Sequence, residues 1–367
     1  MLIAITGSNG FIGKNLYLNL SQNKNFKVFK ISRQTKIHEL KKICKKCDIL
    51  YHLAGANRPK NDSKFNKDNF IYTKKILELL GKNKKKPPII YTSTSRYNEK
   101  TKYGISKKKA EQIIIQYSKK NLSNYYILRL PNVFGKWCKP NYNSFVATFC
   151  YNIINGIELS VNDPNTEVTL VYIDDVCASF IDLLTETAHS ETPKVSPVYT
   201  TTVGEVAKIL TSFKSYRDDL IIGRVGTGLT RLLYSTFLSY AQTDMFSYSI
   251  PCHVDARGTF CEVLKTRDAG QFSFFKAHSG VTRGEHYHHT KTEKFLVLKG
   301  NARFRFRHIS TDEFYSIDTS GKVPTIVETI PGWAHDITNI GNDELIVMLW
   351  ANEIFNPENP DTTAAIV

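Results

Sequence analysis

The sequence predicts an α/β domain with a parallel sheet, followed by an all-β barrel of the jelly-roll kind. Residues 2–5 form an apolar run of strand length that leads directly into closely spaced glycines, and a helical apolar period follows. After about residue 245 the chain changes to short segments of alternating polarity separated by Gly and Pro. The length of 367 residues suits two domains. We place these domains at residues 1–245 and 246–367.

The first element is a strand, a glycine loop and a helix. The loop reads Gly7-x-x-Gly10-x-x-Gly13. Glycine is needed where the backbone turns sharply and where it approaches a pyrophosphate without a Cβ. A helix N-terminus then offers free N–H groups and a positive dipole end to the phosphates. This order predicts a Rossmann-type dinucleotide site, with cofactor contacts from Gly7, Gly10, Phe11, Ile12 and Gly13.

The end of the second strand predicts which dinucleotide binds. Folds that prefer NAD usually place an acidic residue there for the ribose 2′-hydroxyl. No Asp or Glu occurs between Ser21 and His38, and Arg33 follows the predicted strand. An arginine suits a 2′-phosphate, so the sequence favours NADPH over NADH. The alternative is that Arg33 is only an exposed side chain.

Two later strands and a helix supply candidate chemistry. The third strand ends in Leu53-Ala54-Gly55, where the chain can pass close to a cofactor. The next strand ends in the hydroxyls of Ser93 and Thr94. Tyr103-x-x-x-Lys107 follows, and this spacing puts both side chains on one helix face. A lysine ammonium favours the phenolate of a neighbouring tyrosine, which can then exchange a proton with a carbonyl oxygen.

These motifs, in this order, resemble the extended short-chain dehydrogenase/reductase family over about residues 1–245. The resemblance implies Tyr103 as the general acid–base and Lys107 as its partner and binder of the nicotinamide ribose. It also implies a carbonyl-polarising hydroxyl from Thr94 or Ser93, with the strand end favouring Thr94. In members that act on nucleotide sugars, a stretch like Arg129-Leu-Pro-Asn132-Val-Phe-Gly borders the substrate pyrophosphate. Alternatively, Arg129 and Asn132 only cap turns.

The last third of the chain carries a candidate metal site. If residues 285–288 form a strand, His286 and His288 share one face, and Tyr287 and His289 lie on the other. Glu293 and His335 complete a mixed nitrogen and oxygen ligand set suited to Zn²⁺ or another divalent first-row metal. The spacings resemble the two motifs of the cupin superfamily, although the first motif departs at its leading glycine and the second also departs at its beginning. All four ligand positions are intact.

Over its full length the chain resembles the CapF-type family of capsular-polysaccharide enzymes, which fuse a reductase to a cupin. The matching text includes "PNVFGKWCKPNYNS" and the tail "NEIFNPENPDT". The resemblance implies a UDP-2-acetamido-2,6-dideoxy-hexos-4-ulose substrate. The cupin would epimerise C3, and the reductase would then reduce the C4 ketone with NADPH. The implied product is UDP-2-acetamido-2,6-dideoxy-L-talose, on the route to UDP-N-acetyl-L-fucosamine. The metal would stabilise the enolate or only hold the barrel together.

Composition and charge narrow the remaining classes. Of the 49 Lys and Arg, 12 lie from Ser247 onward, against 15 of the 34 Asp and Glu, so the positive excess falls before that point. The lysines fall on predicted helix faces and loop tips without an aromatic-interleaved basic stripe, so we expect a diphosphate ligand and no nucleic acid. We expect no membrane insertion, a cytoplasmic location and a homodimer formed through the cupin.

Three rival functions stay open at this point. The first is a plain 4-ketoreductase whose cupin only dimerises. The second is a redox sensor that holds NADP without turnover, and the third is a basic nucleic-acid binder.

Overall fold

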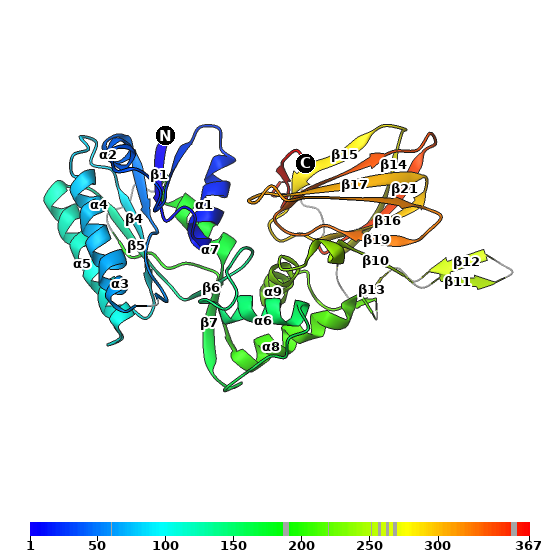
Figure 1. The fold of residues 1–367 in the computed structure, drawn as a ribbon, viewed down its shortest axis with the longest axis horizontal. Helices are drawn as coiled ribbons and strands as arrows, with labels where there is room; N and C mark the ends of the chain where they lie inside the picture. Colours follow the sequence, from blue (N-terminus) through cyan, green and yellow to red (C-terminus); the bar gives the residue numbers. More distant parts are fainter. Residues whose placement is uncertain are drawn as a thin grey trace. The chain divides into compact units, whose positions relative to one another are not determined.

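The computed structural model divides the chain into two compact units (Figure 1). Unit 1 comprises residues 1–134, 141–144 and 167–201, and unit 2 comprises residues 135–140, 145–166 and 202–367. The described residues are 1–59, 61–185, 191–218, 220–250, 252–255, 258–261, 264–266, 270–353 and 358–367. Residues 354–357 of the tail motif therefore lie outside the described residues. The domain boundary at 245/246 stays a prediction.

Unit 1 is built on a five-stranded parallel sheet with the order β2-β1-β3-β4-β5. Its central strands are buried on both faces, as their near-continuous apolar sequences predict. The parallel α/β fold expected of the first part is confirmed. The strands are β1 (Leu2–Thr6), β2 (Lys27–Ile31), β3 (Ile49–His52), β4 (Ile89–Thr94) and β5 (Tyr125–Leu130).

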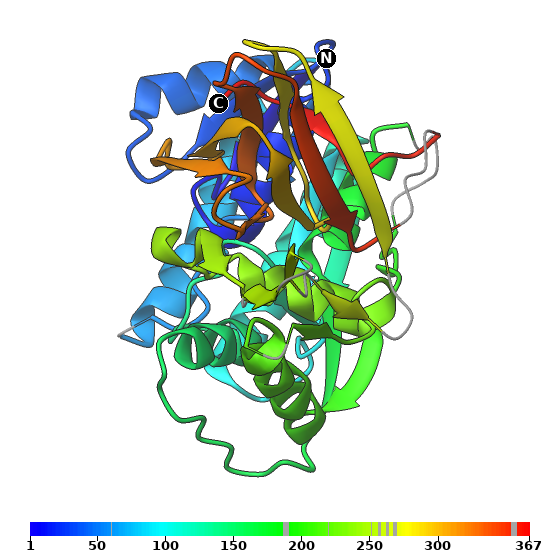
Figure 2. The same cartoon turned by 90° about the vertical axis from the view of Figure 1, so that its right-hand side faces the viewer.

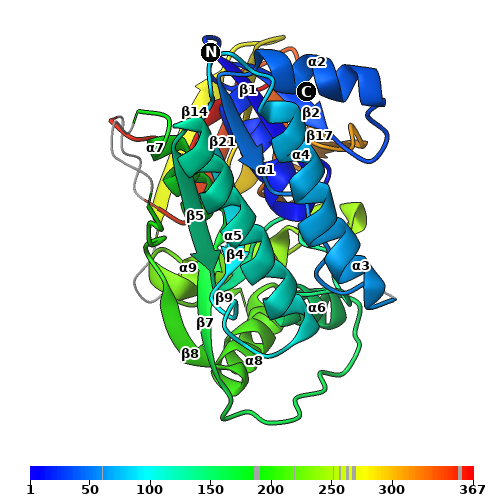
Figure 3. The same cartoon turned by 90° about the vertical axis from the view of Figure 1, so that its left-hand side faces the viewer.

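Helices cover both faces of this sheet. Figure 1 shows α2, α4 and α5 on one face and α1 with α7 on the other, and Figure 3 shows α4 and α5 side by side. The apolar face of α4 packs Ile76 and Leu80 into the same core as Leu50 and Tyr91. The helices are α1 (Phe11–Ser21), α2 (Ile37–Lys46), α3 (Ser63–Phe65), π-helix η1 (Asn66–Ile71), α4 (Tyr72–Leu80), α5 (Lys102–Asn121) and α7 (Ile173–Asp182).

A small second sheet, β6-β7-β8, completes the secondary structure described for unit 1. Strand β6 carries the Asn132 of the predicted substrate motif and pairs in parallel with β7. The strands are β6 (Asn132–Phe134), β7 (Glu167–Tyr172) and β8 (Tyr199–Thr202).

Unit 2 contains two five-stranded sheets, ordered β10-β19-β16-β21-β14 and β18-β17-β20-β15-β22 (Figure 2). They pack face to face, because one apolar cluster contains Val297 and Val347 of the first sheet and Phe306 and Ile337 of the second. The predicted all-β barrel is thus confirmed. The strands are β10 (Ser247–Ser249), β14 (Gln271–Ala277), β15 (Thr282–Tyr287), β16 (Glu293–Lys299), β17 (Asn301–His308), β18 (Phe314–Ser320), β19 (Thr325–Glu328), β20 (Trp333–Asn339), β21 (Leu345–Ala351) and β22 (Thr363–Ala364).

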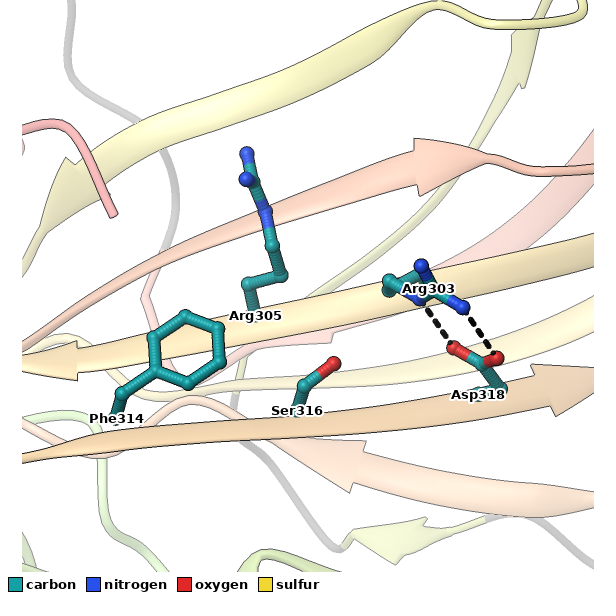
Figure 4. Close-up of a pocket in the computed structure, with 5 residues that line it drawn as sticks. All are labelled: Arg303, Arg305, Phe314, Ser316 and Asp318. Atoms are coloured by element: carbon teal, nitrogen blue, oxygen red, sulfur yellow. Dashed lines mark hydrogen bonds and ion pairs between the residues drawn. The ribbon is translucent and has the colours of Figure 1, made fainter.

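Strand β17 follows the alternation read from its sequence. Phe304 and Phe306 are buried in the barrel core, whereas the arginines that alternate with them at 303, 305 and 307 are not buried. Figure 4 shows Arg303 joined to Asp318 of β18 by two hydrogen bonds of 2.8 and 2.9 Å. The outer faces of β17 and β18 form a shallow hollow of about 520 Å³ there.

Helices precede the barrel within unit 2. Helix α9 contacts α6 and α8, and its buried face includes Leu233 and Phe237. The remaining elements are α6 (Phe145–Ile154), α8 (Val203–Ser212), 3₁₀-helix η2 (Phe213–Tyr216), β9 (Ile221–Ile222), α9 (Gly228–Leu238), 3₁₀-helix η3 (Thr243–Phe246), β11 (Cys252–Asp255), β12 (Gly258–Cys261) and β13 (Lys265–Thr266).

The loop at residues 135–140 packs within unit 2, although it directly follows β6 of unit 1. Trp137 donates a hydrogen bond from Nε1 to Nε2 of His308 at 2.9 Å. Its ring covers Gly332, where an added Cβ would lie only 2.8 Å from Trp137 Cζ2. The Tyr240 hydroxyl donates to the Cys138 carbonyl. The loop is therefore fastened to the segment that leads into β20.

Candidate functional site

The glycine loop between β1 and α1 takes the conformation that its sequence predicts. Gly7 has a φ of +69°, and a Cβ there would lie 2.8 Å from the Ala54 backbone. A Cβ on Gly13 would lie 2.2 Å from the Gly7 carbonyl oxygen. The first turn of α1 follows, with Phe11 and Ile12 as its first residues and no side-chain cap at Gly10. The free N–H groups of this turn can therefore receive phosphate oxygens.

A cavity of about 630 Å³ lies beside this loop in unit 1. Among the predicted cofactor residues, its lining includes Gly7, Gly10, Arg33, Leu53, Ala54 and Gly55. The Arg33 side chain is 88% exposed, and its Nη2 lies 3.2 Å from the Asp68 carboxylate. Asp68 and Lys75 also line the cavity. The sequence did not indicate these two charged residues, because they come from η1 and α4 rather than from β2.

Tyr103 lies at the start of α5 beside the end of β4. The side chain of Tyr103 lies next to that of Thr94. Burial raises the pKa of Tyr103 to about 12, while the neighbouring Thr94 and the charge of Arg96 act to lower it. The neighbouring Ser93 hydroxyl is buried and has no hydrogen-bond partner among the described residues. The structure therefore pairs Tyr103 with Thr94.

Lys107 follows Tyr103 by one helical turn and is almost completely buried. Its ammonium donates a hydrogen bond to the Thr92 carbonyl at 2.8 Å and lies 4.8 Å from the centre of the Tyr91 ring. Burial lowers the pKa of Lys107 to about 8, although the nearby Glu111 acts to raise it. A Cβ added to Gly55 would lie 3.4 Å from this ammonium. The Leu53-Ala54-Gly55 segment and Lys107 are thus close together.

A buried hydrogen-bond chain through His52 holds this arrangement. Thr73 donates to the Asn69 carbonyl, so it must accept from His52 Nε2 at 2.8 Å. His52 Nδ1 then accepts from the Thr6 hydroxyl at 2.7 Å. The chain joins the ends of β1 and β3 to α4, and burial lowers the pKa of His52 to about 3.

Asn69 continues this support toward α5. Its side chain accepts from the Ala56 N–H at 2.6 Å and donates to the Ala56 carbonyl and to the Ser106 hydroxyl. Sequence reasoning missed His52 and Asn69. The only signal was a polar residue at the end of an otherwise apolar strand.

The predicted substrate residues make intramolecular contacts. Arg129 forms two hydrogen bonds with the buried Glu111 carboxylate, at 3.2 and 2.7 Å. Its guanidinium also stacks 3.6 Å from the centre of the Tyr97 ring. Asn132 donates to the Thr169 carbonyl of β7 at 3.2 Å. Arg129 thereby ties β5 to α5, and a role for it or Asn132 in substrate binding stays a prediction.

Four side chains of unit 2 meet in a second candidate site. One ligand atom each from His286, His288, Glu293 and His335 lies within 4.8 Å of all the others. Strands β15, β16 and β20 supply three of them, and His288 directly follows β15. Tyr287 and His289 pack edge to face against each other instead, with ring centres 5.2 Å apart. The structure thus brings together all four predicted metal ligands.

Hydrogen bonds orient the imidazoles for a cation. A carbonyl oxygen only accepts, so His288 Nδ1 donates to the Asp361 carbonyl at 2.5 Å, and His286 Nδ1 donates to the Gly284 carbonyl at 3.0 Å. Each ring then keeps a bare Nε2. Both ring nitrogens of His335 are buried with no hydrogen-bond partner among the described residues. This donor set fits Zn²⁺ or a similar divalent metal.

Charge in the cluster also suits a cation. Burial alone would raise the pKa of Glu293, but the adjacent His288 and His335 side chains hold it well below its usual range. Burial lowers the pKa of His286 to about 4 and also lowers that of His335. Lys291 contacts the second carboxylate oxygen of Glu293 at 2.9 Å. These shifts favour neutral imidazoles at His286 and His335 and an ionised carboxylate at Glu293, the forms that bind metals.

Strand β15 contains a β-bulge directly before His286, the first of the candidate metal ligands. Its pairing with β20 shifts register between Gly284 and His286, and Glu285 has a φ of +56°. A Cβ on Gly284 would lie 2.8 Å from the His335 carbonyl oxygen. The regular strand expected from residue 285 to 288 is therefore interrupted, because the extra residue is absorbed before the first histidine.

Two family descriptions match the chain. Residues 3–198 match the "NAD dependent epimerase/dehydratase family", and residues 253–363 match the "Polysaccharide biosynthesis C-terminal domain". None of the helices in the described ranges is long and apolar enough to span a membrane.

Three known proteins illustrate the similarity. The chain is 49% identical over its full length to a UDP-2-acetamido-2,6-beta-L-arabino-hexul-4-ose reductase of Pseudomonas aeruginosa, of which it covers 99%. A crystal structure of the capsular polysaccharide assembling protein CapF from Staphylococcus aureus matches with a TM-score of 0.69 and 41% identity, covering 100% of both chains. A UDP-glucuronic acid 4-epimerase from Bacillus cereus in complex with NAD has a TM-score of 0.53 over 59% of this chain and 84% of that one. Its identity of 20% supports the fold alone.

Proposed function

We propose that this protein reduces the 4-ketone of a UDP-linked sugar. The premise is its family: the chain belongs to the NAD dependent epimerase/dehydratase family and, over its full length, to the CapF-type capsular polysaccharide proteins. The observation that carries this proposal is the pairing of Tyr103 with Thr94 in the same unit as the glycine-loop cavity. An acid held beside a hydroxyl donor is what a carbonyl needs as hydride reaches its carbon.

NADPH is the proposed hydride donor. When bound, it supplies the hydride from its nicotinamide. Arg33 and Lys75 are cations that line the cavity on the β2 and α4 sides, and Ser32 and Thr35 add hydroxyls. A 2′-phosphate would compete with Asp68 for Arg33. We expect Arg33→Ala to lower kcat/KM for NADPH at least tenfold and to leave that for NADH nearly unchanged, whereas Lys24→Ala should change neither.

Residues of the protein would supply the proton that the C4 oxygen takes up during reduction. As C4 is reduced and the C4–O π electrons move to oxygen, the Tyr103 hydroxyl would give that oxygen its proton. The raised pKa of Tyr103 keeps the hydroxyl protonated at neutral pH, as an acid requires. Thr94 would donate a hydrogen bond to the same oxygen, and Lys107 would bind the nicotinamide ribose. Ser93 is the alternative hydroxyl.

The proposed substrate is a UDP-2-acetamido-2,6-dideoxy-hexos-4-ulose, and the proposed product is UDP-2-acetamido-2,6-dideoxy-L-talose, on the route to UDP-N-acetyl-L-fucosamine. The name of the Pseudomonas aeruginosa relative supports this substrate class. Arg129 and Asn132 would border the diphosphate. We place the reaction in the cytoplasm and propose a homodimer formed through the cupin, which light scattering on the purified protein tests directly.

We propose that unit 2 first inverts C3 of this sugar. A ketone at C4 makes the C3 hydrogen acidic, so a base can remove it and an acid can return it on the other face. A divalent metal held by His286, His288, Glu293 and His335 would stabilise negative charge on the C4 oxygen. Inversion must precede reduction, because reduction removes the ketone that makes C3 acidic.

One experiment tests both activities. The UDP-4-keto sugar is incubated with the protein in D₂O, with and without NADPH, and the products are analysed by NMR. Without NADPH we expect deuterium at C3. With NADPH we expect one deuterium-labelled 4-hydroxy sugar with inverted C3. Absence of NADPH oxidation would contradict the reductase proposal.

Burial at the metal cluster favours a second candidate, a plain reductase with a structural cupin. His288, Glu293 and His335 are 1%, 7% and 5% exposed, so little of the cluster other than His286 faces solvent. A cation there would then brace the barrel. Reduction with no deuterium at C3 would support this candidate against the bifunctional one.

A further inference from the structure

We propose that Asp361 is a positioning residue of the metal centre and that α9 supports it through Ser235 and Arg231. This inference rests on the metal site put forward in the proposed function. It goes further by naming the residues that aim His288. Asp361 is not one of the clustered ligands, and 73 residues separate it from His288 in the chain.

The tail segment that carries Asp361 is fixed against the ligand strand. Strand β22 pairs with β15, so that Ala364 lies opposite His286 and Thr363 opposite Tyr287. The Ala365 N–H donates to the Glu285 carbonyl at 2.8 Å. Backbone hydrogen bonds thus place the C-terminal segment directly beside two of the histidines.

The Asp361 carboxylate binds the backbone of the loop that follows His288. It accepts hydrogen bonds from the N–H groups of His289, Thr290 and Lys291 at 2.8, 2.6 and 2.7 Å. The Thr290 hydroxyl donates a fourth at 2.7 Å. Three consecutive N–H groups that converge on one point form a site for an anion. An asparagine could not accept all four, because an NH₂ group that cannot accept would replace one of the two oxygens.

The same residue orients the imidazole. The Asp361 carbonyl accepts from His288 Nδ1 at 2.5 Å, which leaves Nε2 directed at Glu293, 3.2 Å from its Oε2. One residue therefore fixes both the ring and the loop behind it. If the Asp361 carboxylate no longer held residues 289–291, the Asp361 carbonyl would shift, and the His288 ring would no longer be oriented toward Glu293.

Helix α9 also contacts this loop. The Ser235 hydroxyl donates to the Thr290 carbonyl at 2.6 Å. Arg231 contacts the Thr290 hydroxyl, lies 2.5 Å from the Glu353 carboxylate and lies 3.8 Å from that of Asp361. These side chains are largely buried, so water competes little with the contacts.

The test uses the full chain and the variants Asp361→Asn, Ser235→Ala and Asp318→Asn. Asp318 is the matched control, because its carboxylate likewise accepts hydrogen bonds within unit 2 but lies outside the metal cluster (Figure 4). Zinc affinity is measured by competition with a chromogenic chelator, and Co²⁺ is added as a spectroscopic probe. We expect Asp361→Asn to weaken zinc binding about 10- to 100-fold, as is usual for residues that orient metal ligands, and to shift the Co²⁺ absorption bands.

Ser235→Ala should show a smaller weakening, and Asp318→Asn should behave like wild type. Asp361→Asn with zinc affinity within twofold of wild type and an unchanged Co²⁺ spectrum would overturn the proposal. An equal fall in Tm for the metal-free and zinc-loaded forms of Asp361→Asn would also overturn it, because the residue would then serve the fold alone. If Asp361→Asn does not fold, an unaltered Co²⁺ spectrum in Ser235→Ala overturns it instead. Wild type that binds no zinc would refute the proposed metal site itself.

Discussion

At the scale of single residues, the reductase site depends on groups whose pKa values burial has moved. Tyr103 is kept protonated, and Lys107 titrates close to neutral pH. The free enzyme is therefore poised to donate a proton from Tyr103, and the charge of Lys107 is the part of the site most sensitive to pH.

The pH dependence of reduction should report Lys107. Its pKa of about 8 means that the ammonium is charged below that pH and neutral above it. We expect kcat/KM for NADPH-dependent reduction to fall as pH rises through about 8. In Lys107→Arg the rate should be lower, but the fall should move to higher pH, since arginine stays protonated. A pH profile of Lys107→Arg with the wild-type midpoint would contradict this assignment.

His52 should make unit 1 less stable in acid. Its pKa is about 3 in the fold and about 6.5 when unfolded, so stability is present above 6.5 and is lost as pH falls toward 3. Between pH 6.5 and 5 this loss amounts to about 2 kcal/mol. Urea denaturation at pH 7 and pH 5 measures it. The His52→Gln variant should lose about 2 kcal/mol less than wild type between these pH values, and an equal loss in both proteins would refute the prediction.

Residues also show what sequence reasoning could reach. The sequence could place the glycines, Arg33 and the Tyr103-x-x-x-Lys107 pair on their elements, because each placement depends on neighbours within one turn or one strand end. Their roles stay predictions. The pairing of Arg129 with Glu111 and the roles of His52 and Asn69 were not. They join residues from different elements, and no local period or spacing encodes which polar groups will meet in the core.

At the scale of elements, periodicity predicted the strands and helices that carry the sites. Strand β17 alternates as read, and α5 places Tyr103 and Lys107 in its first two turns. The bulge in β15 was missed, since strand parity assumes regular pairing. The histidines nevertheless share a face, because the irregularity lies before His286. The short strand β22 was also missed, since only the tertiary fold brings the tail beside β15.

The end of α5 offers a stability test. Leu122 occupies the left-handed C-terminal position with a φ of +52° and is 93% exposed. Leucine is strained in this conformation, whereas glycine is the usual residue there. We expect Leu122→Gly to stabilise unit 1 by about 0.5–1 kcal/mol, seen as a higher denaturation midpoint. The end of α4 does not offer the same test, because Gly81 there has a right-handed φ of −56°, which imposes no strain on other residues. A lower denaturation midpoint for Leu122→Gly would show that the contacts of the Leu122 side chain stabilise the fold by more than its backbone strain destabilises it.

At the scale of the whole molecule, the two units hold two separate candidate sites. The cofactor cavity and Tyr103 belong to unit 1, and the metal cluster belongs to unit 2. The proposed reactions should therefore be separable in the intact protein without cutting the chain.

Removing the metal with a chelator and substituting Tyr103 should each abolish or weaken a different one of the two proposed activities. Removing the metal should abolish deuterium incorporation at C3, since the cluster would lose the charge that stabilises the C4 oxygen. Tyr103→Phe should keep that incorporation but lower NADPH oxidation by about 10²–10⁴-fold. NMR and absorbance at the NADPH band measure the two activities on the same samples. Loss of both activities in Tyr103→Phe, with cofactor binding intact, would contradict the division of labour.

The interleaving of the two units has a consequence for inheritance. Residues 135–140 and 145–166 belong to unit 2 but are encoded between segments of unit 1, and Trp137 covers Gly332 within unit 2. A single recombination breakpoint near residue 245 would therefore leave Trp137 behind when the barrel moved to another gene. A foreign barrel joined at that breakpoint would pack against Trp137 but would lack a glycine at the position of Gly332, which the Trp137 ring covers. The two halves should consequently descend as one gene, and their sequences on either side of that contact should change together.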